Sequence, residues 1–187
     1  MYTLGIDIGS TSSKAVILRD GRELLAHQVV PLGTGTIGPE QALDAAFREA
    51  GIAREEIAFT VATGYGRMNC APADAQVSEL SCHAKGIHYL LPGVRTIIDI
   101  GGQDAKALQL SDTGQLLAFQ MNDKCAAGTG RFLEVMAKVL NVPIGELGPL
   151  SAQADRPAAI SNTCTVFAES EVISQLAMGT DKCDIIH

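Results

Sequence analysis

The sequence predicts an α/β protein built from two related halves. Two observations lead to this prediction. The segment Gly5-Ile6-Asp7-Ile8-Gly9-Ser10 returns in similar form as Ile98-Asp99-Ile100-Gly101-Gly102-Gln103, and the order of expected elements starts again in the second half. Each copy ends a strand-like apolar run with an Asp and then supplies glycine where the chain must turn sharply. We therefore expect one domain over residues 1–93 and a second over residues 94–187.

The first half is expected to begin with an antiparallel meander. Apolar runs predict strands over residues 2–9 and 14–18 and a third strand that ends near Val30, with a turn at Asp20-Gly21. Pro39 suits the first position of a helix over residues 40–50, and Gly51 is a natural end for it. A β-branched run predicts a strand over residues 57–63, and helical apolar spacing follows over residues 78–91.

The second half repeats the meander and then becomes helical. Strands are expected over residues 95–100, 105–110 and 115–121, and amphipathic spacing predicts a helix over residues 131–140. A stretch interrupted by Gly and Pro covers residues 142–157, and a last helix is expected over residues 166–178. No later parallel strand with a closing helix is recognisable before His187, so we expect the second domain to be incomplete at its C-terminal side.

Composition narrows the function classes. The 187 residues carry 14 basic and 21 acidic side chains, a formal charge of -7, and no basic cluster, which argues against a nucleic-acid partner. No secretory signal and no apolar run of about 20 residues is present, so we expect a cytoplasmic protein without a membrane partner. The five cysteines are odd in number and widely spread, which argues against a disulfide framework.

The two glycine turns are candidate phosphate-binding tips. Backbone N–H groups suit phosphate oxygens, and an Asp suits magnesium directly or through water. A single Asp-x-Gly would equally be an ordinary turn, so the duplication carries the prediction. Asp7 and Asp99 are the expected magnesium-side carboxylates, acting through bound water. The phosphate-holding backbone is expected at Gly9, Ser10, Thr11, Ser12, Gly101, Gly102 and Gln103.

Further residues near the tips have two interpretations each. Lys14 could reach a phosphate as a point charge or be a solvated strand lysine. Gln103 or Asp104 could orient the attacking water, and the sequence does not separate them. Gly128-Thr129-Gly130 could contact nucleotide or could simply form the loop that starts a helix.

Cys125 and Cys164 each lie directly before an expected helix. Free N–H groups and the positive end of the helix dipole favour a thiolate there, and thiolates bind soft metals. Two thiolates fall short of the four that an iron–sulfur cluster or structural zinc normally takes, and a twofold dimer would supply the other pair. Core packing or a nucleophilic role are the alternatives. Cys70, Cys82 and Cys183 are expected to be packing or surface thiols.

The duplicated order resembles the actin, Hsp70 and sugar-kinase superfamily with its ribonuclease H-like domains, in which two domains hold ATP between their glycine hairpins. More specifically, the chain resembles the activator ATPases of 2-hydroxyacyl-CoA dehydratases, a family that includes the ATPase subunits of benzoyl-CoA reductase. The segments that carry this resemblance are 5–14, 64–67 (Gly-Tyr-Gly-Arg), 98–104, 122–132 (Asn-Asp-Lys-Cys-Ala-Ala-Gly-Thr-Gly-Arg-Phe) and 167–174 (Phe-Ala-Glu-Ser-Glu-Val-Ile-Ser).

The resemblance implies a homodimer with one 4Fe-4S cluster bound by Cys125 and Cys164 of each subunit. It implies ATP and ADP with Mg²⁺ at the tips, an electron donor such as ferredoxin or flavodoxin, and a 2-hydroxyacyl-CoA dehydratase component that receives the electron when ATP is hydrolysed. The family's glycine-rich adenosine segment has no counterpart here. A small-molecule kinase of the same superfamily and a truncated, non-catalytic dimerisation module are the competing hypotheses.

Overall fold

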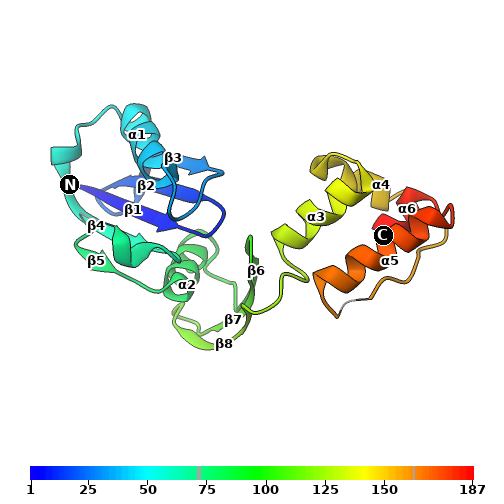
Figure 1. Cartoon of the computed structure of the whole chain (residues 1–187). Coiled ribbons are helices and arrows are strands. Elements are labelled where there is room, and N and C mark those ends of the chain that lie inside the picture. The colour runs from blue at the N-terminus through cyan, green and yellow to red at the C-terminus, as the bar shows by residue number, and fades with distance from the viewer. Residues whose placement is uncertain (71–72, 162) are drawn as a thin grey trace. The chain divides into compact units, whose positions relative to one another are not determined.

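A computed structural model describes residues 1–70, 73–161 and 163–187 of the chain (Figure 1). These residues form two compact units. One unit consists of Met1–Ile97 with Leu108–Phe119, and the other consists of Ile98–Ala107 with Gln120–His187. The domain division at residues 93 and 94 stays a prediction.

A five-stranded sheet forms the centre of the first unit. Its strands are β1 (Tyr2–Ile8), β2 (Ser13–Arg19), β3 (Glu23–Val30), β4 (Ile57–Thr63) and β5 (Ala75–Gln76). The order is β3-β2-β1-β4-β5; β1, β2 and β3 are antiparallel, and β4 runs parallel to β1. The predicted meander and the strand after it are confirmed. This arrangement brings the end of β1 and the end of β4 to the same edge of the sheet.

Two helices and two short 3-10 turns complete the first half. Helix α1 (Gly38–Ala50) lies against β2 and β3, and its fully buried Ala42 and Ala46 pack on a core that includes Ala15 and Ile17. Helix α2 (Glu79–Leu90) has Ser78 as its N-cap residue, and the Ser78 hydroxyl accepts a hydrogen bond from the Ser81 amide at 3.2 Å. The 3-10 turns are η1 (Arg54–Glu56) and η2 (Arg67–Asn69).

The second sheet has three strands in the order β6-β7-β8, which repeats the order of β1, β2 and β3. The strands are β6 (Thr96–Ile100), β7 (Ala105–Leu110) and β8 (Leu116–Asn122). The inward residues Ile97, Leu108 and Leu110 pack with Ala84 of α2. The predicted second meander is confirmed.

Helices form the rest of the second unit. They are α3 (Gly130–Leu140), η3 (Ile144–Glu146), α4 (Leu147–Ser151), α5 (Thr165–Ala177) and α6 (Lys182–Ile186). Met136 and Leu140 of α3, Ala168 and Val172 of α5 and Ile185 of α6 share one buried core. The helices over residues 131–140 and 166–178 are confirmed to within one residue. Apolar spacing does not predict α4 and α6, because each is a single short turn held by this core.

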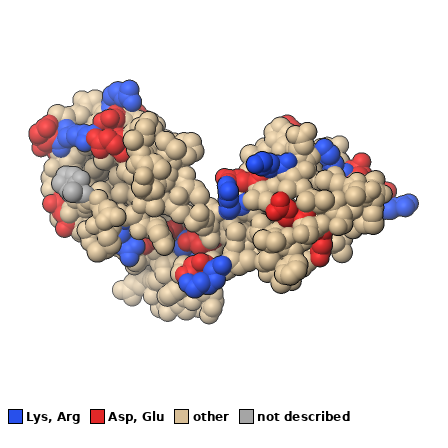
Figure 2. Space-filling model, in the orientation of Figure 1, with Lys and Arg blue, Asp and Glu red and all other residues tan. Residues whose placement is uncertain are grey.

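Charged groups of both signs are mixed over the face drawn in Figure 2, where Lys and Arg lie among Asp and Glu. The described residues contain no helix with the length and apolar character needed to cross a bilayer.

The buried face of the first sheet is expected to supply much of the stability. Ile17 on β2 has no exposed surface, whereas Leu24 on the neighbouring β3 is 54% exposed. We expect Ile17→Ala to lower the free energy of unfolding by about 2–5 kcal/mol, since it leaves a cavity. Leu24→Ala, the matched control, should change it by less than ~0.5 kcal/mol. Equal losses in urea titrations would contradict this account of the core.

Candidate functional site

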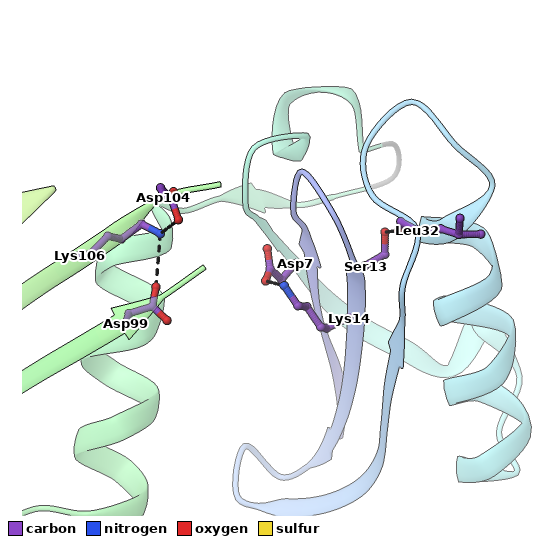
Figure 3. Close-up of polar contacts among 7 residues, drawn as sticks. All are labelled: Asp7, Ser13, Lys14, Leu32, Asp99, Asp104 and Lys106. Carbon is purple, nitrogen blue, oxygen red and sulfur yellow. Dashed lines mark hydrogen bonds and ion pairs between the residues drawn. The ribbon is translucent and has the colours of Figure 1, made fainter. Parts of the chain in front are cut away.

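The first tip is a tight turn between β1 and β2. The Gly9 amide donates to the Ser12 carbonyl at 3.0 Å, and the Gly9 carbonyl accepts from the Thr34 amide at 2.8 Å. The buried Ser13 hydroxyl donates to the Leu32 carbonyl at 2.7 Å (Figure 3). These bonds anchor the tip to the loop between β3 and α1, so its shape is fixed before any ligand arrives.

The amides at this tip are available to an anion. Among the residues that the structure describes, the backbone N–H groups of Ser10, Thr11 and Ser12 donate no hydrogen bond. Successive unpaired amides in a turn form a concave donor surface that suits phosphate oxygens. The geometry therefore agrees with the use predicted for Gly9, Ser10, Thr11 and Ser12, and their contact with nucleotide stays a prediction.

Asp7 is the next-to-last residue of β1, directly behind this tip. Its Oδ2 accepts from the Lys14 ammonium at 2.9 Å, while its Oδ1 is buried and has no hydrogen-bond partner among the described residues. Gly64, at φ +83, borders the same oxygen, and a Cβ at Gly64 would lie 2.2 Å from Oδ1. A buried acceptor without a partner calls for a ligand or water. The position fits a magnesium ion held through water.

The second tip repeats this design with one change. The Gly101 amide donates to the Asp104 carbonyl at 2.8 Å. The Lys106 ammonium lies 2.7 Å from Asp104 Oδ1 and 3.3 Å from Asp99 Oδ2, and Figure 3 shows it between the two carboxylates. Lys106 was not among the residues predicted from sequence. Its signal was the spacing, because Asp99 and Lys106 are seven residues apart, as are Asp7 and Lys14.

The second tip is also bonded to the start of α3. The Gly130 amide donates to the Gly101 carbonyl at 2.9 Å, and the Arg131 amide donates to the Gly102 carbonyl at 2.9 Å. The buried Thr129 hydroxyl donates to the Ala126 carbonyl at 2.6 Å, which fixes the preceding loop. Gly128-Thr129-Gly130 therefore forms the loop that starts a helix, and its contact with nucleotide stays a prediction.

Cys164 lies directly before a helix, as the sequence predicts, whereas Cys125 lies further from its helix, because Thr129 is the N-cap residue of α3. Cys164 is the N-cap residue of α5, with extended backbone. Cys125 precedes α3 in a loop that Asn122 holds: the Cys125 amide donates to Asn122 Oδ1 at 3.2 Å, and Asn122 Nδ2 donates to the Cys125 carbonyl at 2.9 Å. Both thiols are free and half-buried.

The donor set fits half of a four-thiolate cluster site. Cys125 and Cys164 offer two soft ligands, and the buried Thr165 hydroxyl beside Cys164 has no partner among the described residues. Hydrogen bonds to sulfur are one means by which proteins tune such clusters. Cys70 and Cys183 suit this chemistry less well. Burial raises the pKa of the Cys70 thiol, and partial burial with a hydrogen bond to Asp181 raises the pKa of Cys183.

Residues 4–187 match the model of the BadF/BadG/BcrA/BcrD ATPase family. The chain belongs to this family. It is similar to the activator of lactoyl-CoA dehydratase from Anaerotignum propionicum, with 63% identity over 186 residues that span 100% of this chain and 72% of that protein. It is also similar to the (R)-2-hydroxyglutaryl-CoA dehydratase activating ATPase of Acidaminococcus fermentans, with 56% identity and coverage of 100% and 72%. The predicted family resemblance is confirmed.

Solved structures agree with this membership of the BadF/BadG/BcrA/BcrD family. The activator of the 2-hydroxyisocaproyl-CoA dehydratase from Clostridium difficile, with bound ADPNP, matches with a TM-score of 0.94 and 56% identity over 100% of this chain and 69% of that one. A 2-dehydro-3-deoxygalactonokinase from Sinorhizobium meliloti matches with a TM-score of 0.51 and 16% identity, over 98% and 76% of the two chains. That second likeness shows the fold alone, and it confirms the predicted sugar-kinase-like α/β class.

The space around Asp7 Oδ1 is expected to be intolerant of any added atom. Gly64→Ala places a methyl group in the gap and forces a positive φ on alanine, so we expect at least a tenfold loss of ADP affinity in the presence of Mg²⁺, or about 1.4 kcal/mol. Titration calorimetry measures it. Gly86→Ala in α2, where nothing lies within 4 Å, is the control and should bind normally. Normal binding by Gly64→Ala would show that this gap is not part of the site.

Proposed function

We propose that this chain is an ATP-dependent activator that passes a low-potential electron to a 2-hydroxyacyl-CoA dehydratase component. Relatives at 63% and 56% identity are named as activators of lactoyl-CoA and (R)-2-hydroxyglutaryl-CoA dehydratases, and a relative at 33% identity is one of the subunits of benzoyl-CoA reductase from Thauera aromatica. The observation that carries the proposal is the pair of hydrogen bonds between the second tip and α3, the helix that follows Cys125.

For nucleotide binding, we propose that the two tips hold ATP or ADP with Mg²⁺. Asp7 and Asp99 hold the magnesium ion through water, and Lys14 supplies a positive charge to a phosphate. The amides of the two turns hold the phosphate oxygens. Gln103 orients the attacking water, because the carboxylate of its competitor Asp104 is already bound to Lys106 at 2.7 Å.

In the redox half, Cys125 and Cys164 hold a 4Fe-4S cluster together with the same pair from a second copy. Held by these thiolates, a 4Fe-4S cluster would supply one-electron redox chemistry with ferredoxin or flavodoxin as the donor, and the charge, hydrogen bonds to sulfur and exposure around Cys125 and Cys164 would set its potential. The homodimer is needed because each copy offers half of the ligands. We place the protein in the cytoplasm with these partners.

The two halves are joined through the backbone. Because Gly130 and Arg131 of α3 donate to Gly101 and Gly102, a change in the turn that binds phosphate must move the start of α3 or break these bonds. Cys125 lies in the loop just before that helix. Nucleotide exchange would therefore alter the surroundings of the Cys125 sulfur, and such a change would link hydrolysis to the driving force for electron transfer.

Anaerobic reconstitution with iron and sulfide tests the ligand assignment. We expect wild-type protein to become a brown dimer with about four iron ions for two chains. Cys125→Ser and Cys164→Ser should lose most of this iron, since each removes two of the four ligands from the dimer. Cys82→Ser is the control and should load normally. Iron analysis and light scattering give the result, and full loading of Cys125→Ser would refute the assignment.

Thiol alkylation tests the coupling without any cluster. We expect ADP with Mg²⁺ to change the rate at which iodoacetamide modifies Cys125 in iron-free protein by roughly fivefold, a typical coupling between sites. Gly130→Pro removes the amide that bonds to Gly101, at a first-turn position where helices accept proline, and should abolish the ADP effect while ADP still binds.

Two controls isolate the hydrogen bond. Gly130→Ala keeps the amide and adds a Cβ at an ordinary 3.4 Å from the Gly101 carbonyl, so the ADP effect should persist. Lys182→Pro makes the same first-turn change in α6 and should also leave it intact. An ADP effect that survives in Gly130→Pro would mean that the tip and the cysteine loop communicate by another route.

A further inference from the structure

We propose that Lys106 is a positioning residue of the ATPase site: it fixes the two carboxylates of the second tip, Asp99 and Asp104, and thereby the water shell of magnesium. Lys14, its counterpart in the first half, does not have this task. The inference deepens the proposed function and rests on it.

The two lysines differ in exposure. Each lies seven residues after an Asp that is next to last in its strand, and each forms an ion pair with that Asp. The Lys14 side chain is 38% exposed, so it can leave Asp7 and reach toward a ligand. The Lys106 side chain is 2% exposed and already lies within 3.3 Å of both carboxylates. The duplicated lysines therefore have different tasks.

Lys106 also occupies an unusual place in its strand. In β7 the buried residues alternate with less buried ones, and Lys106 shares the buried positions with Leu108 and Leu110. A charge at such a position is stable only when it is paired, and an apolar residue of similar volume would serve stability equally well or better. Stability alone does not explain this lysine.

The two acids divide their contacts with Lys106 unequally. Asp99 and Asp104 are both partly buried, with side chains 26% and 30% exposed, and two carboxylates that share one cation repel each other when that cation is removed. Asp104 takes the short contact of 2.7 Å, and Asp99 takes the longer one of 3.3 Å. Asp104 thus has the closer contact with Lys106, and Lys106 lies near enough to hold both carboxylates in place. Lys106 sets this division.

The test compares ATP hydrolysis and ADP binding in the full chain at graded Mg²⁺ concentrations. Because partners of metal-holding groups typically contribute 10–100-fold to metal affinity or activity, we expect Lys106→Met to raise the half-saturating Mg²⁺ concentration about tenfold or more. The kcat should fall by a similar factor, with the KM for ATP changed by less than about threefold. Lys14→Met should instead raise the KM, and Lys85→Met, on the exposed side of α2, should change neither.

A double variant separates positioning from folding. Lys106→Met combined with Asp104→Asn removes the repulsion between the acids, so we expect the Tm to recover toward that of wild type while the high Mg²⁺ requirement persists. Recovery of both would show a purely structural role and overturn the proposal. Lys106→Arg keeps the charge but changes the geometry of the pair, so it should fold and still require more Mg²⁺. A normal Mg²⁺ requirement in Lys106→Arg and in the double variant would also overturn it.

ADP binding by the wild-type protein tests the proposed nucleotide site separately from the role of Lys106. If wild-type protein shows no Mg²⁺-dependent ADP binding in calorimetry, the nucleotide site itself is wrong. If wild-type protein binds ADP with Mg²⁺ and Lys106→Met behaves identically, the nucleotide site stands and only the role of Lys106 falls.

Discussion

The candidate site depends on the close approach of the chain to itself just after β1 and just after β6, each of which carries an aspartate as its next-to-last residue. A Cβ at Gly9 would lie 2.9 Å from the Ser12 carbonyl oxygen, and a Cβ at Gly101 would lie 2.3 Å from Asp104 Oδ1. A side chain at Gly9 would meet backbone, whereas one at Gly101 would meet the Asp104 carboxylate that Lys106 holds in place. Each turn follows its aspartate closely in the chain, so the proposed places for a metal ion and for phosphate depend on the same constraint.

The two tips share this constraint but differ in what holds them. The first is anchored to the loop between β3 and α1 through Thr34 and Leu32, whereas the second is anchored to α3 through Gly130 and Arg131. The first tip is thus bonded to a loop, and the second tip is bonded to a helix whose preceding loop contains Cys125. Under the proposed function, this difference in support lets the second tip, and not the first, influence the Cys125 loop.

Local patterns were sufficient to predict much of this from sequence. The meanders, α1, α3 and α5 follow from apolar spacing and from glycine and proline at the expected positions. The position of Cys164 directly before α5 follows from the predicted start of that helix. The role of Lys106 was not predicted, because a lysine in a strand normally faces solvent. Its burial depends on the ion pairs with Asp99 and Asp104. The unpartnered Asp7 Oδ1 and the bonds from α3 to the second tip depend on segments distant in sequence, which spacing cannot reveal.

The order of the second sheet leaves one side of β6 open for pairing among the described strands. In the first sheet β1 is paired on both sides, by β2 and by β4; among the described strands its counterpart β6 is paired by β7 alone. Ile98 and Ile100 on that edge strand are 75% and 62% exposed. An unpaired, apolar edge strand is a template for another strand. A strand that pairs with β6, from whatever source, would therefore extend the second sheet and cover these two side chains.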